Sequence, residues 1–125
     1  MVKINKKILI VEDDEDFLYI LKKRFDIEGF SIINAKDGEE GVLIAEKDQP
    51  DLILSDMLMP KMDGMAMAKK IKEFDAKVPI IFLTNIKNTD YANETQKSDN
   101  IDYLIKSDTP IDDIIAKVKI KLNIK

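Results

Sequence analysis

The chain of 125 residues contains no cysteine and no histidine. The lack of cysteine excludes a disulfide framework, a thiolate metal site and a thiol nucleophile. The lack of histidine excludes histidine acid/base catalysis and a phosphohistidine on this chain. No apolar run approaches the roughly 20 residues of a membrane span, and no amino-terminal segment resembles a signal peptide. These absences favour a cytoplasmic protein that does not engage a membrane.

An excess of basic residues is also missing. The chain carries 20 Lys and Arg residues against 24 Asp and Glu residues, for a net charge of −4. Nucleic-acid binding needs a concentrated basic face, so this class of function is not expected. The Lys-rich stretch from Lys117 to Lys125 is interpreted as a solvated helix face. The length fits one domain covering residues 1–125, with no internal repeat or linker.

Short apolar runs alternate with amphipathic stretches along the whole chain. Runs rich in β-branched residues are typical of buried parallel strands, and their alternation with helices predicts an α/β fold with right-handed crossovers. The predicted strands are Ile8–Val11, Phe30–Ala35, Leu52–Leu54, Ile80–Leu83 and Tyr103–Ile105.

Capping residues mark the first three predicted helices. Asp14 can cap the first helix, which Gly29 ends, and Asp37 opens a second helix that closes before Pro50. Asp63 begins the third. The inward positions of the first and third helices are Phe17, Leu18, Leu21, Phe25, Met65, Ala68 and Ile71.

Two further helices are predicted in the last third of the chain. The polar segment 85–100 is expected to form a short, weakly held helix with Tyr91 and Ala92 as its apolar anchors. Thr109-Pro110-Ile111-Asp112 resembles a capping box with proline at the first helical position. The apolar stripe of the last helix is Ile111, Ile114, Ile115, Val118 and Leu122.

Polar side chains stand where four of the strands end. Glu12 and Asp13 follow the first, Asp56 follows the third, Thr84 ends the fourth and Lys106 ends the fifth. Ligands of open parallel sheets bind beyond the carboxyl ends of the strands. These side chains are therefore expected to form one site.

The ingredients of this site point to phosphoryl chemistry. Clustered carboxylates repel one another, and Mg²⁺, which prefers oxygen ligands, would relieve that repulsion. Asp56 could attack phosphorus to form an acyl phosphate, with Thr84 and Lys106 as hydrogen-bond donors. A plainer alternative remains for these residues: helix capping for Glu12, Asp13 and above all Asp14, a loop hydrogen bond for Thr84, and a solvated charge for Lys106.

The motifs resemble those of a known family, the receiver domains of two-component response regulators. They are Ile-Leu-Ile-Val-Glu-Asp-Asp, Asp-Leu-Ile-Leu-Ser-Asp-Met-Leu-Met-Pro, Asp63-Gly64, Thr84 and Tyr-Leu-Ile-Lys. The resemblance covers nearly the whole chain. It implies a flavodoxin-like (βα)5 fold, a doubly wound parallel sheet with strand order 2-1-3-4-5.

The resemblance also implies residue roles. Asp56 would be the phosphoacceptor, and Mg²⁺ would be held by Asp13, by Asp56, by the backbone carbonyl of Leu58 and, through water, by Glu12. Thr84 would be the switch hydroxyl and Lys106 the phosphoryl-binding ammonium. Tyr103 would be the switch aromatic, although an edge-strand aromatic that covers the core is a competing interpretation.

Such a domain takes its phosphoryl group from a histidine kinase or a histidine phosphotransfer protein. Phosphorylation would then remodel the surface of the fourth helix, fifth strand and fifth helix for an unknown output partner. It would be a phosphoacceptor rather than a turnover enzyme. Whether the chain is a stand-alone regulator or part of a longer protein, and whether it forms a homodimer, is left open.

The chain departs from the family pattern at several positions. Ser107 follows Lys106 where proline is usual; a cis bond before a non-proline residue costs about 2.5–4 kcal/mol, so a trans bond and a reshaped loop are predicted. Asn85 replaces a small residue, and could narrow access to Asp56 or contact the phosphoryl group. The apolar Leu58 and Ile86 predict a long-lived phosphoaspartate, because polar residues there orient hydrolytic water in some relatives.

Two other functions compete with this interpretation. An aspartyl-nucleophile phosphatase of the haloacid-dehalogenase type would need a second aspartate two residues after Asp56, where Leu58 stands. A receiver-like module could instead bind partners without phosphorylation, which the departures at Asn85 and Ser107 keep open.

Overall fold

The computed structural model describes residues 3–85 and 100–124. Strands and helices alternate along this part of the chain, as the sequence predicts. The elements are β1 (Lys7–Val11), α1 (Glu15–Glu28), β2 (Ser31–Ala35), α2 (Gly38–Asp48), β3 (Leu52–Asp56), α3 (Gly64–Phe74), β4 (Ile80–Thr84), β5 (Ile101–Ile105), the 3₁₀ helix η1 (Lys106–Asp108) and α5 (Ile111–Lys121). The predicted fourth helix, with Tyr91 and Ala92, and the position of Ile86 lie outside the described residues.

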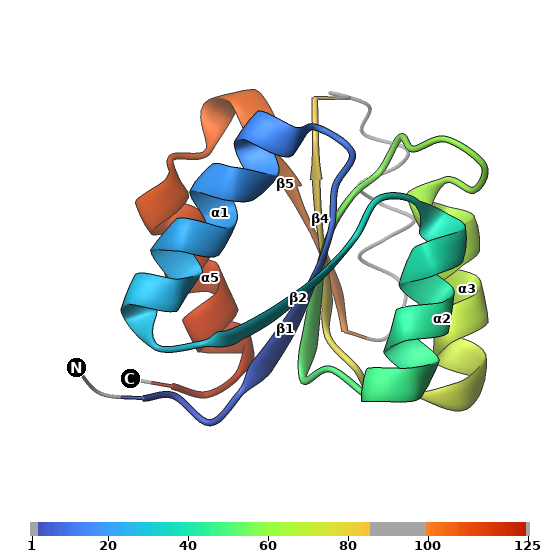
Figure 1. Cartoon of the computed structure of the whole chain (residues 1–125), viewed down its shortest axis with the longest axis horizontal. Coiled ribbons are helices and arrows are strands. Elements are labelled where there is room, and N and C mark those ends of the chain that lie inside the picture. Colours follow the sequence, from blue (N-terminus) through green and yellow to red (C-terminus); the bar gives the residue numbers. More distant parts are fainter. Residues whose placement is uncertain (1–2, 86–99, 125) are drawn as a thin grey trace.

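The five strands form one parallel sheet with the order β2-β1-β3-β4-β5. In Figure 1, α1 and α5 cover one face of the sheet, and α2 and α3 cover the other. This arrangement confirms the predicted doubly wound α/β fold. Among the described residues, no helix is both long enough and apolar enough to cross a bilayer.

Each face of the sheet has its own apolar core. Ile8 and Ile10 of β1 pack with Phe25 on the α1/α5 face, and the alternate residues Leu9 and Val11 pack with Phe82 on the α2/α3 face. Because the central strands are buried on both faces, they are apolar throughout instead of alternating. Their carboxyl ends are therefore firmly held positions for polar side chains.

The predicted helix boundaries are confirmed at the first three helices. Asp14 accepts hydrogen bonds from the backbone N–H groups of Asp16 and Phe17, and Gly29 ends α1 with φ of 99°. This positive φ favours glycine, which has no Cβ to clash. Asp37 and Asp63 cap α2 and α3 in the same way as Asp14. On α3, Ala68 and Ile71 are buried as predicted, but the fully buried methionine is Met67, and Met65 is only half-buried.

The capping box predicted for the last helix is wrong. Pro110, not Thr109, occupies the N-cap of α5, and no side chain caps it. The Thr109 hydroxyl instead donates to the Ile105 carbonyl at 2.7 Å. The reason is the 3₁₀ turn η1, which folds Thr109 back onto the end of β5, a local structure that the sequence pattern did not reveal.

The interpretation of the carboxy-terminal lysines as a solvated face is also wrong. Lys117 and Lys121 form ion pairs with Asp102 of β5 at 3.8 and 2.8 Å, and Lys119 pairs with Glu28 at the end of α1 at 2.5 Å. These acids belong to other elements, β5 and α1, so the charge pattern of α5 could not identify them. The lysines therefore join α5 to both of its neighbours.

Candidate functional site

Three carboxylates converge at the carboxyl edge of the sheet. Glu12 and Asp13 follow β1, and Asp56 is the last residue of β3, which lies next to β1. One carboxylate oxygen from each of the three lies within 4.8 Å of the other two. Glu12 is only 3% exposed, whereas Asp13 is exposed. The acidic cluster Glu12–Asp13–Asp56 thus has a buried side and an open side.

Lys106 reaches this acidic cluster from the end of β5. Its Nζ lies 3.0 Å from Glu12 Oε1, to which it donates a hydrogen bond, and 3.8 Å from Asp56 Oδ2. The Lys106 side chain is 17% exposed. It is therefore not the solvated surface charge of the plainer alternative.

An aromatic ring completes the surroundings of Lys106. Its Nζ lies 4.3 Å from the centroid of the Phe17 ring, within the range of a cation–π interaction. The sequence pattern assigned Phe17 only to the inward face of the first helix and missed this contact. The available signal was its place in the first turn of α1, which starts at the same sheet edge as the carboxylates.

Burial sets the proton affinity of the two inner carboxyl groups. It raises the pKa of Asp56, an effect that Lys106 and the backbone N–H groups of Met57 and Leu58 partly offset. Burial likewise raises the pKa of Glu12, against the hydrogen bonds that it accepts from the Asp14 N–H and Lys106. Both carboxylates are thus costly to keep charged in the folded protein.

The backbone around Asp56 is tightly packed. The Met57 N–H donates to Asp56 Oδ1 at 2.8 Å, and the Gly64 N–H donates to the Met57 carbonyl at 2.7 Å. A Cβ on Gly64 would lie 2.6 Å from the Phe82 ring, so only glycine permits this close approach. The Asp63-Gly64 pair therefore begins α3 and at the same time anchors the loop behind Asp56.

Thr84, Asn85 and Ser107 lie at the neighbouring strand ends. Thr84 is buried at the end of β4, one residue beyond Leu83, which pairs with Asp56 in the sheet. Asn85 Oδ1 accepts the Ser107 N–H at 2.9 Å. The bond between Lys106 and Ser107 is trans, which confirms that prediction.

The other two predicted site residues are Tyr103 on β5 and Leu58 after β3. Tyr103 is in the body of β5, paired with Phe82 and half-buried against the α2/α3 core. Leu58 is in the loop after β3, with a side chain that is 59% exposed. The role of its backbone carbonyl as a metal ligand stays a prediction.

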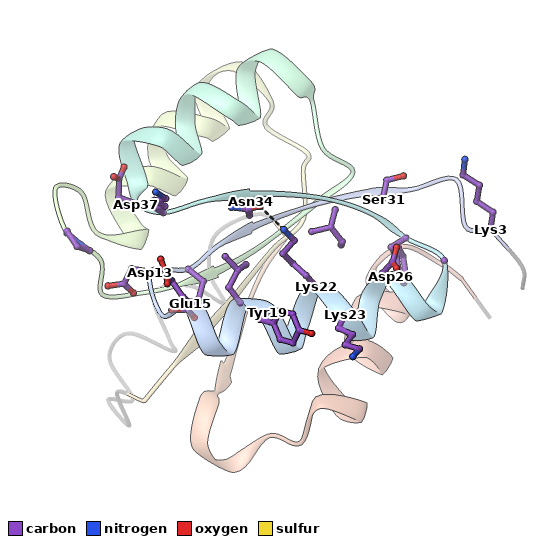
Figure 2. A pocket seen from close by; sticks show the side chains of 17 residues that line it. Lys3, Asp13, Glu15, Tyr19, Lys22, Lys23, Asp26, Ser31, Asn34 and Asp37 are labelled. Atoms are coloured by element: carbon purple, nitrogen blue, oxygen red, sulfur yellow. Dashed lines mark hydrogen bonds between the residues drawn. The ribbon is translucent and has the colours of Figure 1, made fainter.

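A groove runs from the acidic cluster along α1 and the edge strand β2. Figure 2 shows Asp13 and Glu15 at one end and Asp26, Ser31 and Lys3 at the other. Midway, Lys22 Nζ donates to Asn34 Oδ1 at 3.3 Å, which links the helix to the strand. The open side of the acidic cluster is thus continuous with a surface groove.

The donor set of the acidic cluster suits a hard divalent cation. All three residues offer carboxylate oxygens, which Mg²⁺ and Ca²⁺ prefer, and the chain has no cysteine or histidine to offer a thiolate or an imidazole. A cation at this place would offset the mutual repulsion of the carboxylates. The residues present therefore fit a Mg²⁺ site.

Comparisons with known proteins agree with this geometry. The sporulation initiation phosphotransferase F of Bacillus subtilis is 33% identical over 98% of this chain and 98% of its own length. The alkaline phosphatase synthesis transcriptional regulatory protein of the same organism is 40% identical over 65% of this chain. This chain spans 34% of the length of that regulator.

Solved structures give the same result. The receiver domain of the Francisella response regulator 1452 superposes with a TM-score of 0.87 at 30% identity, covering 95% of this chain and 98% of that one. A two-component response regulator from Clostridium difficile superposes with a TM-score of 0.87 at 31% identity, covering 95% of this chain and 97% of that one. The family model of the response regulator receiver domain matches residues 8–119. The chain therefore belongs to the response regulator receiver domain family.

Proposed function

We propose that this receiver domain accepts a phosphoryl group on Asp56 with the help of a divalent cation, Mg²⁺ in the cell. The observation that carries the proposal is the meeting of three carboxylates and one ammonium: oxygens of Glu12, Asp13 and Asp56 lie within 4.8 Å of one another, and Lys106 Nζ lies 3.8 Å from Asp56 Oδ2. This combination of an acceptor, metal ligands and a cation is what phosphoryl transfer requires.

The chemistry assigns one task to each residue. An oxygen of Asp56 forms a bond to phosphorus while the bond from phosphorus to the donor's histidine nitrogen breaks, and the imidazole leaves. The bound cation, held by Glu12, Asp13, Asp56 and the Leu58 carbonyl, would neutralise charge on the phosphoryl oxygens. Lys106 would donate a hydrogen bond to one such oxygen.

Two more residues belong to the proposed response. Thr84, buried at the end of β4, would donate its hydroxyl to the phosphoryl group and so shift position. Tyr103 on the neighbouring strand would change its rotamer in turn. The face that includes β5 and α5 would then bind an output partner, and a homodimer through this face stays a prediction.

The donor is proposed to be the phosphohistidine of a histidine kinase or a phosphotransfer protein. The chain has no histidine of its own, so the phosphohistidine must lie outside these 125 residues. One relative that matches over its full length is named a phosphotransferase, which favours a place within a phosphorelay. A cytoplasmic location and the absence of nucleic-acid and membrane binding by this domain are part of the same proposal.

Small phosphoryl donors test the proposal without any partner protein. The protein is incubated with Mg²⁺ and acetyl phosphate or phosphoramidate, and its intact mass is measured. The expected result is one added phosphoryl group, which is absent in Asp56→Asn and retained in Asp26→Asn, a matched change on the exposed face of α1. No adduct with either donor would overturn the proposal and favour a module that binds without phosphorylation. Continuous hydrolysis of a general phosphomonoester would favour the phosphatase alternative.

A further inference from the structure

We infer that Phe17 is a positioning residue that holds the Lys106 ammonium beside the acidic cluster. Lys106 Nζ lies 4.3 Å from the Phe17 ring centroid, 3.0 Å from Glu12 Oε1 and 3.8 Å from Asp56 Oδ2. The ring and the two carboxylates thus share one ammonium group. The inference rests on the proposed function, in which Lys106 contacts a phosphoryl oxygen.

The surroundings make this contact stronger than a surface cation–π pair. The Lys106 side chain is 17% exposed, and Phe17 packs against the α1/α5 core, so both partners are partly shielded from water. Cation–π attraction grows as the cation loses hydration. The same helix carries a looser pair for comparison: Lys23 Nζ lies 5.8 Å from the ring of Tyr19, which is 63% exposed.

The neutral Phe17 ring can hold the ammonium without offsetting its positive charge, which the carboxylates cannot do. Glu12 binds the ammonium closely, but its negative charge also offsets the positive charge that a phosphoryl oxygen would attract. Phe17 carries no net charge, so it restricts the position of the ammonium and does not reduce the positive charge that Lys106 presents to a phosphoryl oxygen. If a bound cation drew Glu12 away from Lys106, the ring would still hold the ammonium near Asp56.

The contact itself can be measured in the metal-free protein. An aromatic ring shifts the NMR signals of groups above its face upfield, so the Cε protons of Lys106 should be upfield of those of other lysines. The upfield shift should disappear in Phe17→Leu and persist in Phe17→Tyr. It should also persist in Tyr19→Leu, the matched loss of a ring from the looser pair. An unchanged Lys106 signal in Phe17→Leu would overturn the inference.

The consequence is measured with acetyl phosphate, which needs no docking partner. The strength of a partly shielded cation–π contact predicts that Phe17→Leu is phosphorylated about fivefold to thirtyfold more slowly, with Phe17→Tyr and Tyr19→Leu close to the parent. In a Lys106→Met background the same Phe17→Leu change should have no further effect, because the ring then has nothing to position. An equal slowing in both backgrounds would assign Phe17 a merely structural role.

Two checks keep the outcomes separate. If Phe17→Leu does not fold, Phe17→Met replaces it, because methionine also fills an apolar site but has no ring. If the parent protein accepts no phosphoryl group, the proposed function fails, and the Lys106 chemical shift still decides whether Phe17 holds the ammonium. A lost shift with an unchanged phosphorylation rate would overturn the positioning role.

Discussion

Replacing Asp56 with asparagine is expected to stabilise the metal-free protein, although it removes the phosphoacceptor. Two like charges 4.8 Å apart, the upper limit within the acidic cluster, repel by about 1 to 3.5 kcal/mol for dielectric constants between 80 and 20. Asp56 feels two such repulsions, from Glu12 and Asp13, and one attraction, from Lys106 at 3.8 Å. Its neutralisation therefore removes about one net repulsion. Because Asp13 is exposed to water, we expect the lower part of this range, about 1–2 kcal/mol.

Thermal and urea unfolding in the presence of a chelator measure this gain. A stabilisation of 1 kcal/mol raises the Tm of a chain of this size by roughly 3–5 °C. The asparagine side chain can still accept the Met57 N–H, so this hydrogen bond of the loop is kept. The control Asp26→Asn makes the same change of net charge on an exposed surface and should alter stability by no more than about 0.5 kcal/mol. An Asp56→Asn variant that is no more stable than the parent would refute the electrostatic account.

The gain should depend on pH in a defined direction. Burial raises the pKa of Asp56 above its ordinary value of 3.8 and that of Glu12 above 4.5. Between the ordinary and the raised values the folded protein binds more protons than the unfolded chain, so its stability falls as pH rises through this range. The advantage of Asp56→Asn should therefore be greatest at neutral pH and shrink on acidification. Added Mg²⁺ should also reduce the stability advantage of Asp56→Asn, since the cation binds the folded parent more tightly than the variant.

Three other changes test the same region. Lys106→Met should raise the pKa of Asp56 further and slow its phosphorylation by acetyl phosphate, as followed by carboxyl NMR titration and intact mass; an unchanged pKa would contradict the ion pair. Asn85→Ala should cost about 1 kcal/mol in urea unfolding, and less in a Ser107→Pro background, where the donor N–H is already gone. Leu58→Asn should shorten the lifetime of the phosphoryl group on Asp56; an unchanged or longer lifetime would contradict the role of the apolar side chain.

The fold could be predicted because its signals are local. Each central strand is an apolar run, and Asp14 and Gly29 carry their capping roles in their own side-chain chemistry. The convergence of Glu12, Asp13, Asp56 and Lys106 was also predictable, since parallel strands place their carboxyl ends at one edge. For these four residues, the order of strands and helices along the chain was enough to predict that they meet.

The errors arose where a partner belongs to another element or the backbone turns unexpectedly. Thr109 matched a capping pattern, but the turn η1 directs its hydroxyl to Ile105. Lys117 resembled a solvated residue because its partner Asp102 belongs to another element. Phe17 was recognised as apolar, but only the folded chain brings Lys106 over its ring. In each case the side chain had two physically reasonable uses, and tertiary contacts selected one.

The two departures from the family pattern near Lys106, Asn85 and Ser107, form a hydrogen bond with each other. A proline after Lys106 would have no N–H to donate, whereas Ser107 donates to Asn85 Oδ1 at 2.9 Å. The hydrogen bond ties the turn after β5 to the end of β4, and the Phe17 ring holds the ammonium at the other end of the lysine side chain. Lys106 Nζ therefore comes within 3.8 Å of Asp56 although the peptide bond that follows it is trans. In this chain, the side chains of Asn85 and Phe17 hold Lys106 at its backbone end and at its ammonium end, and so place the ammonium beside Asp56.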